Sequence, residues 1–140
     1  MSLDVHLNRK KIVSYDNGQT FKDEVDEVYW ANITHNLGTM AREAGIYEAL
    51  WRPYRLKPNY NIPEGDHKAE YKFEEDNPSV AKDIIDVLEK GLADLKSRPE
   101  HFEKFNASNG WGLYKHFVPF VEEYLAACKE HPDAEIYCYR

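Results

Sequence analysis

Cysteine is scarce in this chain, and long apolar runs are missing. Cys128 and Cys138 are the only two cysteines and form no CxxC pair, which excludes a disulfide framework and a zinc site built on cysteines. No stretch approaches the roughly 18 apolar residues that a membrane helix needs, and the first residues lack the basic start and apolar core of a signal peptide. We therefore expect reduced, buried thiols in a cytoplasmic protein without a membrane partner.

The usual short signatures of catalysis are missing as well. No glycine-rich phosphate loop follows a strand-like segment, no Gly-x-Ser-x-Gly or HExxH motif is present, and neither cysteine has a neighbouring base. We therefore predict a non-catalytic protein with no cofactor and no bound metal. One enzymatic alternative stays open, a metal-dependent site of Asp4, His6 and His35, because Asp4 and His6 share one face of a strand. The competing interpretation of that pair is a hydrogen-bonded surface.

The chain does contain enough apolar and aromatic material for one folded domain. Of its 140 residues, 42% are hydrophobic and 14% are aromatic, which is too many for a disordered chain. A chain of this size, with neither an internal repeat nor a linker-like tract, can bury one substantial core. We predict a single domain over residues 1–140.

Negative charge dominates the ionisable residues. The chain has 25 acidic and 18 basic residues and a formal charge of −7, which opposes binding to nucleic acid or anionic lipid by repulsion. We expect no direct nucleic-acid binding, because this charge suits a partner with a basic surface. The alternative is that the charge serves solubility alone.

Both ends of the chain show the two-residue alternation of strands. Apolar and polar side chains alternate over residues 3–7 and again over residues 136–139. Residues 12–15 and 19–21 flank Asp16-Asn17-Gly18, whose Asn-Gly pair favours a tight hairpin turn. Because a lone terminal strand is unstable, we expect residues 3–7 to pair with residues 136–139.

From about Val28 the apolar spacing changes to three and four residues. The stripe comprises Trp30, Ile33, Leu37, Met40 and Ala44. This spacing predicts an amphipathic helix that runs from about Val28 to a C-terminal cap at Gly45. Residues 46–51 either extend this helix or form a short turn of their own.

Residues 54–76 contain prolines and turn signals among charged residues. Pro63-Glu64-Gly65-Asp66 predicts a turn, and Tyr71 and Phe73 alternate with charged neighbours, so we expect an extended or strand-like piece. The acidic residues of this segment suggest a flexible arm that imitates nucleic-acid phosphates toward a basic groove. The competing interpretation is a solvated loop.

Further helices are predicted between this segment and the last strand. Asn77-Pro78 is typical of a helix start, Arg98-Pro99 ends that helix and begins a short one, and His131-Pro132 ends a last helix over residues 117–128. The predicted fold class is α+β, with a small antiparallel or mixed sheet that includes both terminal strands. About three to four helices are expected to cover one face of this sheet.

Four strings of the sequence resemble a known family. They are Met1-Ser2-Leu3-Asp4-Val5, Tyr29-Trp30-Ala31-Asn32-Ile33-Thr34-His35-Asn36-Leu37, Ala44-Gly45-Ile46-Tyr47 and Asn109-Gly110-Trp111-Gly112. Together they resemble a family of small uncharacterised bacteriophage and prophage proteins, over the whole chain except residues 54–76, which look like a variable insertion. The resemblance supplies a setting, the cytoplasm of a bacterial host, and no functional residues.

This setting and the acidic charge together suggest an accessory protein that acts on the host. The expected activity is binding, and possible inhibition, of a host protein or complex in defence or nucleic-acid processing, as compact acidic anti-CRISPR proteins act. That expectation is an analogy from setting and charge, because fold and family do not by themselves define a site.

A polar face is predicted on the helix after Val28. It consists of Asn32, His35, Asn36, Thr39 and Arg42. Because Asn, His and Thr are poor helix formers, their presence indicates a role beyond solvation. We predict a binding surface centred on His35. The competing interpretation is a hydrogen-bonded layer that ties the helix to the sheet or to the loop at residues 109–111.

The second functional hypothesis is a site for a small, nucleotide-like ligand. Its residues would be His35, Asn36, Trp51, Arg52 and Trp111. Aromatic rings stack on bases and arginine binds phosphate, so this set suits such a ligand. Asn109 joins the candidate binding residues through the loop over residues 106–112, in which we expect the ring of Trp111 to pack back on the fold.

Overall fold

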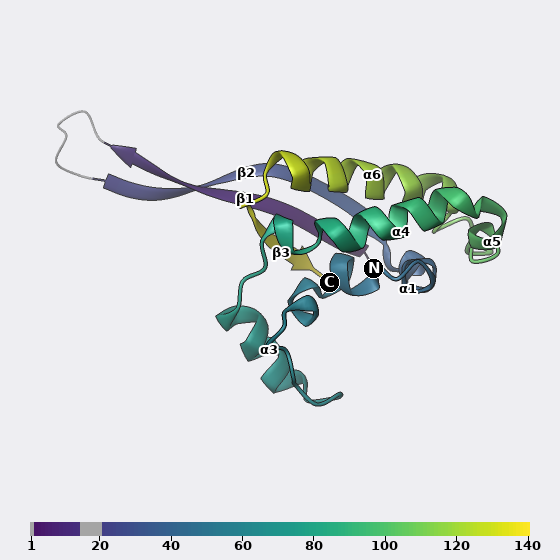
Figure 1. Cartoon of the computed structure of the whole chain (residues 1–140), viewed down its shortest axis with the longest axis horizontal. Coiled ribbons are helices and arrows are strands. Elements are labelled where there is room, and N and C mark those ends of the chain that lie inside the picture. Colours follow the sequence, from purple (N-terminus) through teal and green to yellow (C-terminus); the bar gives the residue numbers. More distant parts are fainter. Residues whose placement is uncertain (1, 15–20) are drawn as a thin grey trace.

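A three-stranded sheet joins the two ends of the chain. The computed structural model describes residues 2–14 and 21–140. Its strands are β1 (Ser2–Ser14), β2 (Phe21–Thr34) and β3 (Glu135–Tyr139), which lie in the order β2-β1-β3 with antiparallel pairing throughout. The α+β class and the pairing of the two terminal strands are confirmed (Figure 1).

One face of this sheet is buried under helices. Leu3, Val5 and Leu7 are fully buried, and Leu7 lies opposite the buried Ile136 of β3. The two long helices α4 (Ile85–Ser97) and α6 (Tyr114–Glu130) lie side by side, and α6 packs on β2. Each large apolar side chain buried in this layer contributes roughly 1.5–3 kcal/mol to stability, so this layer provides most of the core.

The hairpin of β1 and β2 reaches beyond the helices. The two strands pair from Ser2↔Thr34 to Ser14↔Phe21, whereas β3 pairs only with residues 4–8 of β1. The outer part of the hairpin is therefore a two-stranded arm that projects from the body of the molecule (Figure 1). The hairpin is confirmed, and the turn predicted at Asp16-Asn17-Gly18 lies outside the described residues.

The helix predicted from about Val28 is wrong at its start, because residues 28–34 belong to β2. The short helices η1 (His35–Leu37) and α1 (Gly38–Glu43) follow this strand. Trp30 is 56% exposed while Ile33 is buried, so the spacing of these two residues fits a helix only by coincidence. A register shift at Leu7 and Asn8 leaves Val28 without a partner in β1, and this bulge hides the strand alternation in the sequence.

The strand-like conformation predicted near residues 71–73 is also wrong. After α2 (Tyr47–Trp51) and η2 (Pro53–Leu56), the chain forms the helix α3 (His67–Asp76). The carboxylate of Asp66 begins α3 by accepting a hydrogen bond from the Ala69 N–H at 3.2 Å. The predicted turn is present, with Gly65 at φ 90°. Glu70, Glu74, Glu75 and Asp76 lie on a folded helix rather than on a flexible arm.

Glu70 anchors α3 to the body of the protein. Its side chain is buried, and its Oε1 accepts hydrogen bonds from Tyr54 (2.5 Å) and from Arg55 Nε (2.7 Å), with Arg52 Nη1 at 3.4 Å. Burial alone would raise the pKa of Glu70, but the hydrogen bonds from Tyr54 and Arg55 and the charges of Arg55 and Arg52 lower it. Glu70 is therefore a buried carboxylate that stays ionised.

Short helices and turns complete the fold between α3 and β3. These short helices are η3 (Ala81–Asp83) and α5 (Pro99–Glu103). Over the described residues the fold contains six α-helices and three 3-10 helices. More helices form than predicted, because the segment after β2 is broken into several short ones. The helix start predicted at Asn77-Pro78 is wrong, because Asn77 caps the end of α3. The chain that follows is tied to β3 instead, since the backbone N–H of Ile136 donates to the carbonyl oxygen of Ser79 at 2.8 Å.

Gly91 of α4 packs against the segment that joins α1 to α2. A Cβ atom at Gly91 would overlap Cγ2 of Ile46 and lie 3.1 Å from the carbonyl oxygen of Ala44. Helix propensity alone would make Gly91→Ala stabilising by roughly 1 kcal/mol, but overpacking costs about 1–3 kcal/mol. We expect the overlap to dominate, so that Gly91→Ala lowers the free energy of unfolding by about 1–2 kcal/mol in a urea melt.

The matched reference for this prediction is Ala93→Gly at an exposed position of the same helix. That change reports helix propensity without a contact from the loop. A Gly91→Ala protein that is more stable than the wild type would show that Ile46 and Ala44 move aside at no cost.

Candidate functional site

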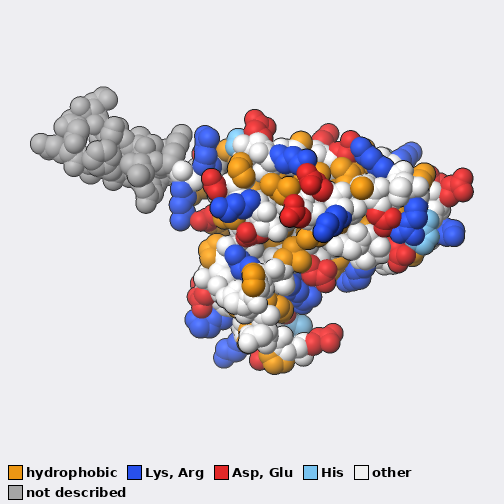
Figure 2. Space-filling view, viewed as in Figure 1, with side chains coloured by type: hydrophobic (Ala, Val, Ile, Leu, Met, Phe, Trp, Pro, Cys, Tyr) orange, Lys and Arg blue, Asp and Glu red, His pale blue; other side chains and the backbone are white. Residues whose placement is uncertain are grey.

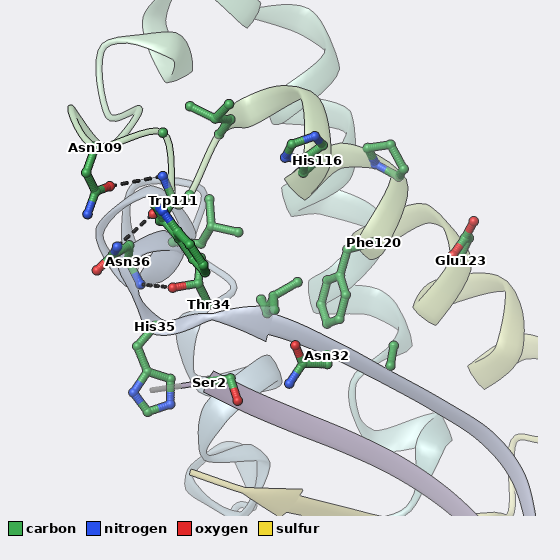
Figure 3. Close-up of a pocket in the computed structure, with 17 residues that line it drawn as sticks. Ser2, Asn32, Thr34, His35, Asn36, Asn109, Trp111, His116, Phe120 and Glu123 are labelled. Carbon is green, nitrogen blue, oxygen red and sulfur yellow. Dashed lines mark hydrogen bonds between the residues drawn. The ribbon is translucent and has the colours of Figure 1, made fainter.

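A groove of about 1130 Å³ opens where the end of β2 faces the loop before α6 (Figure 3). Asn32, His35 and Asn36 line it from the first segment, and Asn109 and Trp111 from the loop. His116, Phe120 and Glu123 of α6 complete it. The sequence contained no signal for these α6 residues, because their contribution depends on where α6 docks.

Asn36 fixes the loop against η1. Its Nδ2 donates to the backbone carbonyl oxygen of Trp111 at 2.7 Å, and the backbone N–H of Trp111 donates to Oδ1 of Asn109 at 2.9 Å. Gly112 permits this approach, since a Cβ atom there would lie 2.9 Å from Cβ of Asn36 and its φ is 122°. The hydrogen-bonded contact considered for the polar face is thus present, and Asn36 makes it.

The indole ring of Trp111 does not pack back on the fold as expected. It is 71% exposed, because the loop is held through its backbone and through Asn109 and Asn36 rather than through the ring. The ring instead forms part of the groove wall (Figure 3). An exposed indole at the mouth of a groove is available for contact with another molecule.

His35 lies between this groove and a second concave site. Its imidazole points away from Asn36 and Trp111 (Figure 3) and lies edge-on to the ring of Trp51, with centroids 6.1 Å apart. The second site, which we call the arginine hollow, has a volume of about 280 Å³ and is lined by His35, Gly38, Arg42, Tyr47, Trp51, Arg52 and Arg140. Sequence reasoning missed Arg140, because only the pairing of β3 with β1 brings this last residue near α1 and α2.

The structure therefore divides the predicted site residues between two sites. Asn32, Asn36, Asn109 and Trp111 line the groove, Arg42, Trp51 and Arg52 line the hollow, and His35 lines both. Thr39 is exposed and lines neither. The site predicted for a nucleotide-like ligand combines residues of the groove with residues of the hollow. Trp111 lines the groove and Arg52 lines the hollow, so these two residues do not share one site.

A third candidate surface is the solvent side of the sheet. Strand register places Trp30, His6 and Tyr137 in one row across the three strands and Asn32, Asp4 and Tyr139 in the next. We call these six residues the open sheet face. Trp30 is 56%, Tyr137 40% and Tyr139 61% exposed, so the aromatic rings of this face are not covered.

The remaining reactive side chains are held in structural contacts. His6 bonds to Glu27 and Asp4 accepts from Asn32, and within residues 2–14 and 21–140 no three His, Cys, Asp or Glu side chains form a group that could hold a metal ion. Cys128 is buried and Cys138 partly buried, both as free thiols. Burial raises the pKa of each to about 12, which leaves these thiols protonated and poorly nucleophilic.

Comparisons with known proteins do not assign the chain to a family. No protein-family model, curated protein or solved structure matches it. Over the described residues, no helix is both long and apolar enough to cross a membrane. The resemblance to bacteriophage proteins therefore stays a prediction, and the functional argument rests on the geometry of the three surfaces.

Proposed function

We propose that this chain is a non-catalytic binding protein that docks on a partner protein through its open sheet face. The observation that carries the proposal is the row of Trp30, His6 and Tyr137, with Tyr139 beside it, on an uncovered side of the sheet. Exposed aromatic groups gathered on one rigid surface are typical of interaction sites.

The aromatic rings of this face are already ordered by their neighbours. The His6 ring lies 5.2 Å from the Tyr139 ring in an edge-on arrangement and 6.4 Å from the Trp30 ring. Tryptophan and tyrosine provide a large share of the binding energy at protein interfaces. Because strand pairing fixes these side chains before binding, a partner would lose less conformational entropy on docking than with a mobile loop.

Carboxylates beside the rings favour a partner that presents arginine. Asp4 lies within the open sheet face, and Glu27 and Glu135 lie opposite Asn8 in the adjacent row. A guanidinium group can stack on an aromatic ring and donate to a nearby carboxylate at the same time. On the view of the molecule in Figure 2, by contrast, acidic and basic side chains are interspersed, so charge alone marks no binding surface there.

The phage resemblance supports a host origin for the partner. An arginine-rich surface is common in proteins that handle nucleic acid, because it neutralises phosphates. A host defence or nucleic-acid-processing complex would present such a surface to an acidic phage protein. Inhibition would follow when docking covers the residues that the complex needs for nucleic acid.

The test uses a hexa-arginine peptide as a defined probe of the proposed chemistry. We expect backbone NMR shifts on titration to concentrate on β1, β2 and β3 around Trp30 and Tyr139. Trp30→Ala combined with Tyr139→Ala should weaken binding about tenfold or more, as expected for loss of interface anchors. Affinity should also fall as salt rises, because charge pairs at the surface are screened over about 8 Å at physiological ionic strength.

Trp111→Ala is the matched control, since this second exposed tryptophan lies in the groove and not on the sheet. It should leave peptide affinity unchanged. Equal weakening by both variants, or an affinity that is flat with salt, would contradict the proposal.

A further inference from the structure

The arginine hollow concentrates positive charge in an acidic chain. Three arginines and His35 line it, and no Asp or Glu is among its lining residues. Arg52 and Arg55 share the single carboxylate of Glu70, and Arg140 pairs with Glu74. Arg42 has no carboxylate within 4.0 Å among the described residues. The hollow thus carries uncompensated positive charge although the chain has a net charge of −7.

Aromatic and backbone contacts hold the guanidinium groups in place. Arg42 lies 4.0 Å from the centroid of the Tyr47 ring, and Tyr47 stacks on Trp51 with centroids 5.0 Å apart. Nη1 of Arg140 donates to the carbonyl oxygen of Trp51 at 2.9 Å. Like charges that are fixed close together repel one another, so an arrangement of this kind is stabilised when an anion binds.

We infer that the arginine hollow binds the phosphate group of a ligand. Its three arginines come from α1, from the residue after α2 and from the residue after β3, so three separate segments contribute guanidinium donors to one space. A tetrahedral phosphate has oxygens in several directions and accepts bidentate hydrogen bonds from guanidinium groups. A planar carboxylate would satisfy fewer of these donors.

His35 and Gly38 form part of the wall of the hollow. Nε2 of His35 is buried and has no hydrogen-bond partner among the described residues. A buried nitrogen is closed to a ligand in the hollow, so the arginines provide the donors. Gly38 keeps the wall open beside it, because the nearest atoms to a Cβ at Gly38 would be those of Arg42 and Tyr47, 3.6 Å and 3.8 Å away.

The aromatic residues of the hollow do not form a base-binding surface. Trp51 is 3% exposed, and the Tyr47 ring is already in contact with Arg42 and Trp51. The hollow is therefore expected to recognise the phosphate itself and to be indifferent to an attached base. This site is independent of the open sheet face, and it does not require that the protein docks on a partner.

The test is a titration with inorganic phosphate, adenosine monophosphate and adenosine at constant ionic strength, followed by NMR shifts of residues 35–52. We expect saturable binding of phosphate and of the nucleotide with similar dissociation constants, and none of adenosine. Arg42→Gln should weaken phosphate binding about tenfold or more, the effect of one lost charge-assisted hydrogen bond. Arg42→Lys should restore only part of the affinity, because lysine lacks the bidentate fork.

Arg42 is suited to this test because it is exposed and takes no part in the Glu70 cluster. A thermal melt of each variant verifies folding. Arg98→Gln, which removes an exposed arginine paired with Asp94 elsewhere on the chain, is the matched control and should bind phosphate as the wild type does. Phosphate binding that is absent, or that is equally affected by Arg42→Gln and Arg98→Gln, would overturn the inference. Tight binding of adenosine monophosphate without binding of inorganic phosphate would overturn the inference that the hollow recognises the phosphate group alone.

Discussion

Deletion of Ala134–Arg140 is expected to abolish the cooperative unfolding transition of the protein. The deletion removes β3, which pairs with β1 from Asp4↔Tyr139 to Asn8↔Glu135, and it removes the buried side chains of Ala134 and Ile136. It also removes the acceptor for the Ala81 N–H and the donor to the Ser79 carbonyl, which join the start of η3 to the sheet.

The size of this effect follows from the marginal stability of a domain. Burial of Ile136 alone contributes roughly 1.5–3 kcal/mol, and uncovering β1 exposes further apolar surface, against a total stability of roughly 5–15 kcal/mol. The measurement is a thermal melt followed by circular dichroism. A full-length chain that carries Tyr137→Ala and Tyr139→Ala, two exposed positions of β3, is the control and should keep its transition. A sharp transition near the wild-type temperature in the deleted chain would show that β3 is dispensable.

Glu70→Gln is expected to destabilise the protein by about 2–3 kcal/mol. The substitution keeps the shape of the side chain but removes the charge that Arg55 and Arg52 share at 2.6 Å and 3.4 Å. The side chains of Arg55 and Arg52 are 32% and 27% exposed, so water can solvate their charges in part when the carboxylate is removed. The loss of stability therefore stays at the lower end of that expected for breaking a buried salt bridge. A urea melt measures the difference.

The pH dependence of this variant follows from the lowered pKa of Glu70 in the folded state. The pKa of Glu70 in the folded protein lies below its ordinary value of 4.5. Such a group stabilises the folded state when the pH is above its pKa in the unfolded chain, and this stabilisation is lost as the pH falls through its pKa in the folded protein. The stability difference between wild type and Glu70→Gln should therefore be full at neutral pH and narrow below about pH 4.5. Glu75→Gln, at an exposed position of the same helix, should stay within about 0.5 kcal/mol of the wild type. A Glu70→Gln protein as stable as Glu75→Gln would show that the cluster does not anchor α3.

The terminal strands could be predicted from the sequence because their alternation is regular and one face is fully buried. The alternation over residues 3–7 and 136–139 identifies both strands, and their instability as single strands identifies the pairing. The end of β2 could not be recognised in this way. Trp30 places a large apolar side chain on the solvent face, and the bulge at Val28 shifts the alternation, so the pattern imitates a helix.

The helix α3 was missed for a different reason. Its mean character is polar, and it is anchored by the buried Glu70, whose partners Tyr54, Arg52 and Arg55 come from an earlier segment. No local pattern indicates such a tertiary contact. The end of α4 at Arg98-Pro99 and the end of α6 at His131-Pro132 were predictable, because proline disfavours helix in the residue before it.

The candidate sites were predictable as residue types and not as groupings. The polar character of His35, Asn36 and Arg42 suggested function, but their assignment to one helix face placed them on a single surface. In the structure the chain changes from β2 to η1 at His35, and this change directs Asn36 toward the groove and Arg42 toward the hollow. The open sheet face was missed, because the row of Trp30, His6 and Tyr137 depends on the register of three strands.

The projecting arm of β1 and β2 has a consequence for how this protein can vary in length. Beyond residue 8 of β1, the two strands pair only with each other. Adding or removing the same number of residues in both strands of the arm would keep their pairing, and no residue on the body side of the change would be displaced. Paired insertions and deletions can therefore accumulate in the arm during evolution while the core, the groove, the hollow and the aromatic rows stay unchanged.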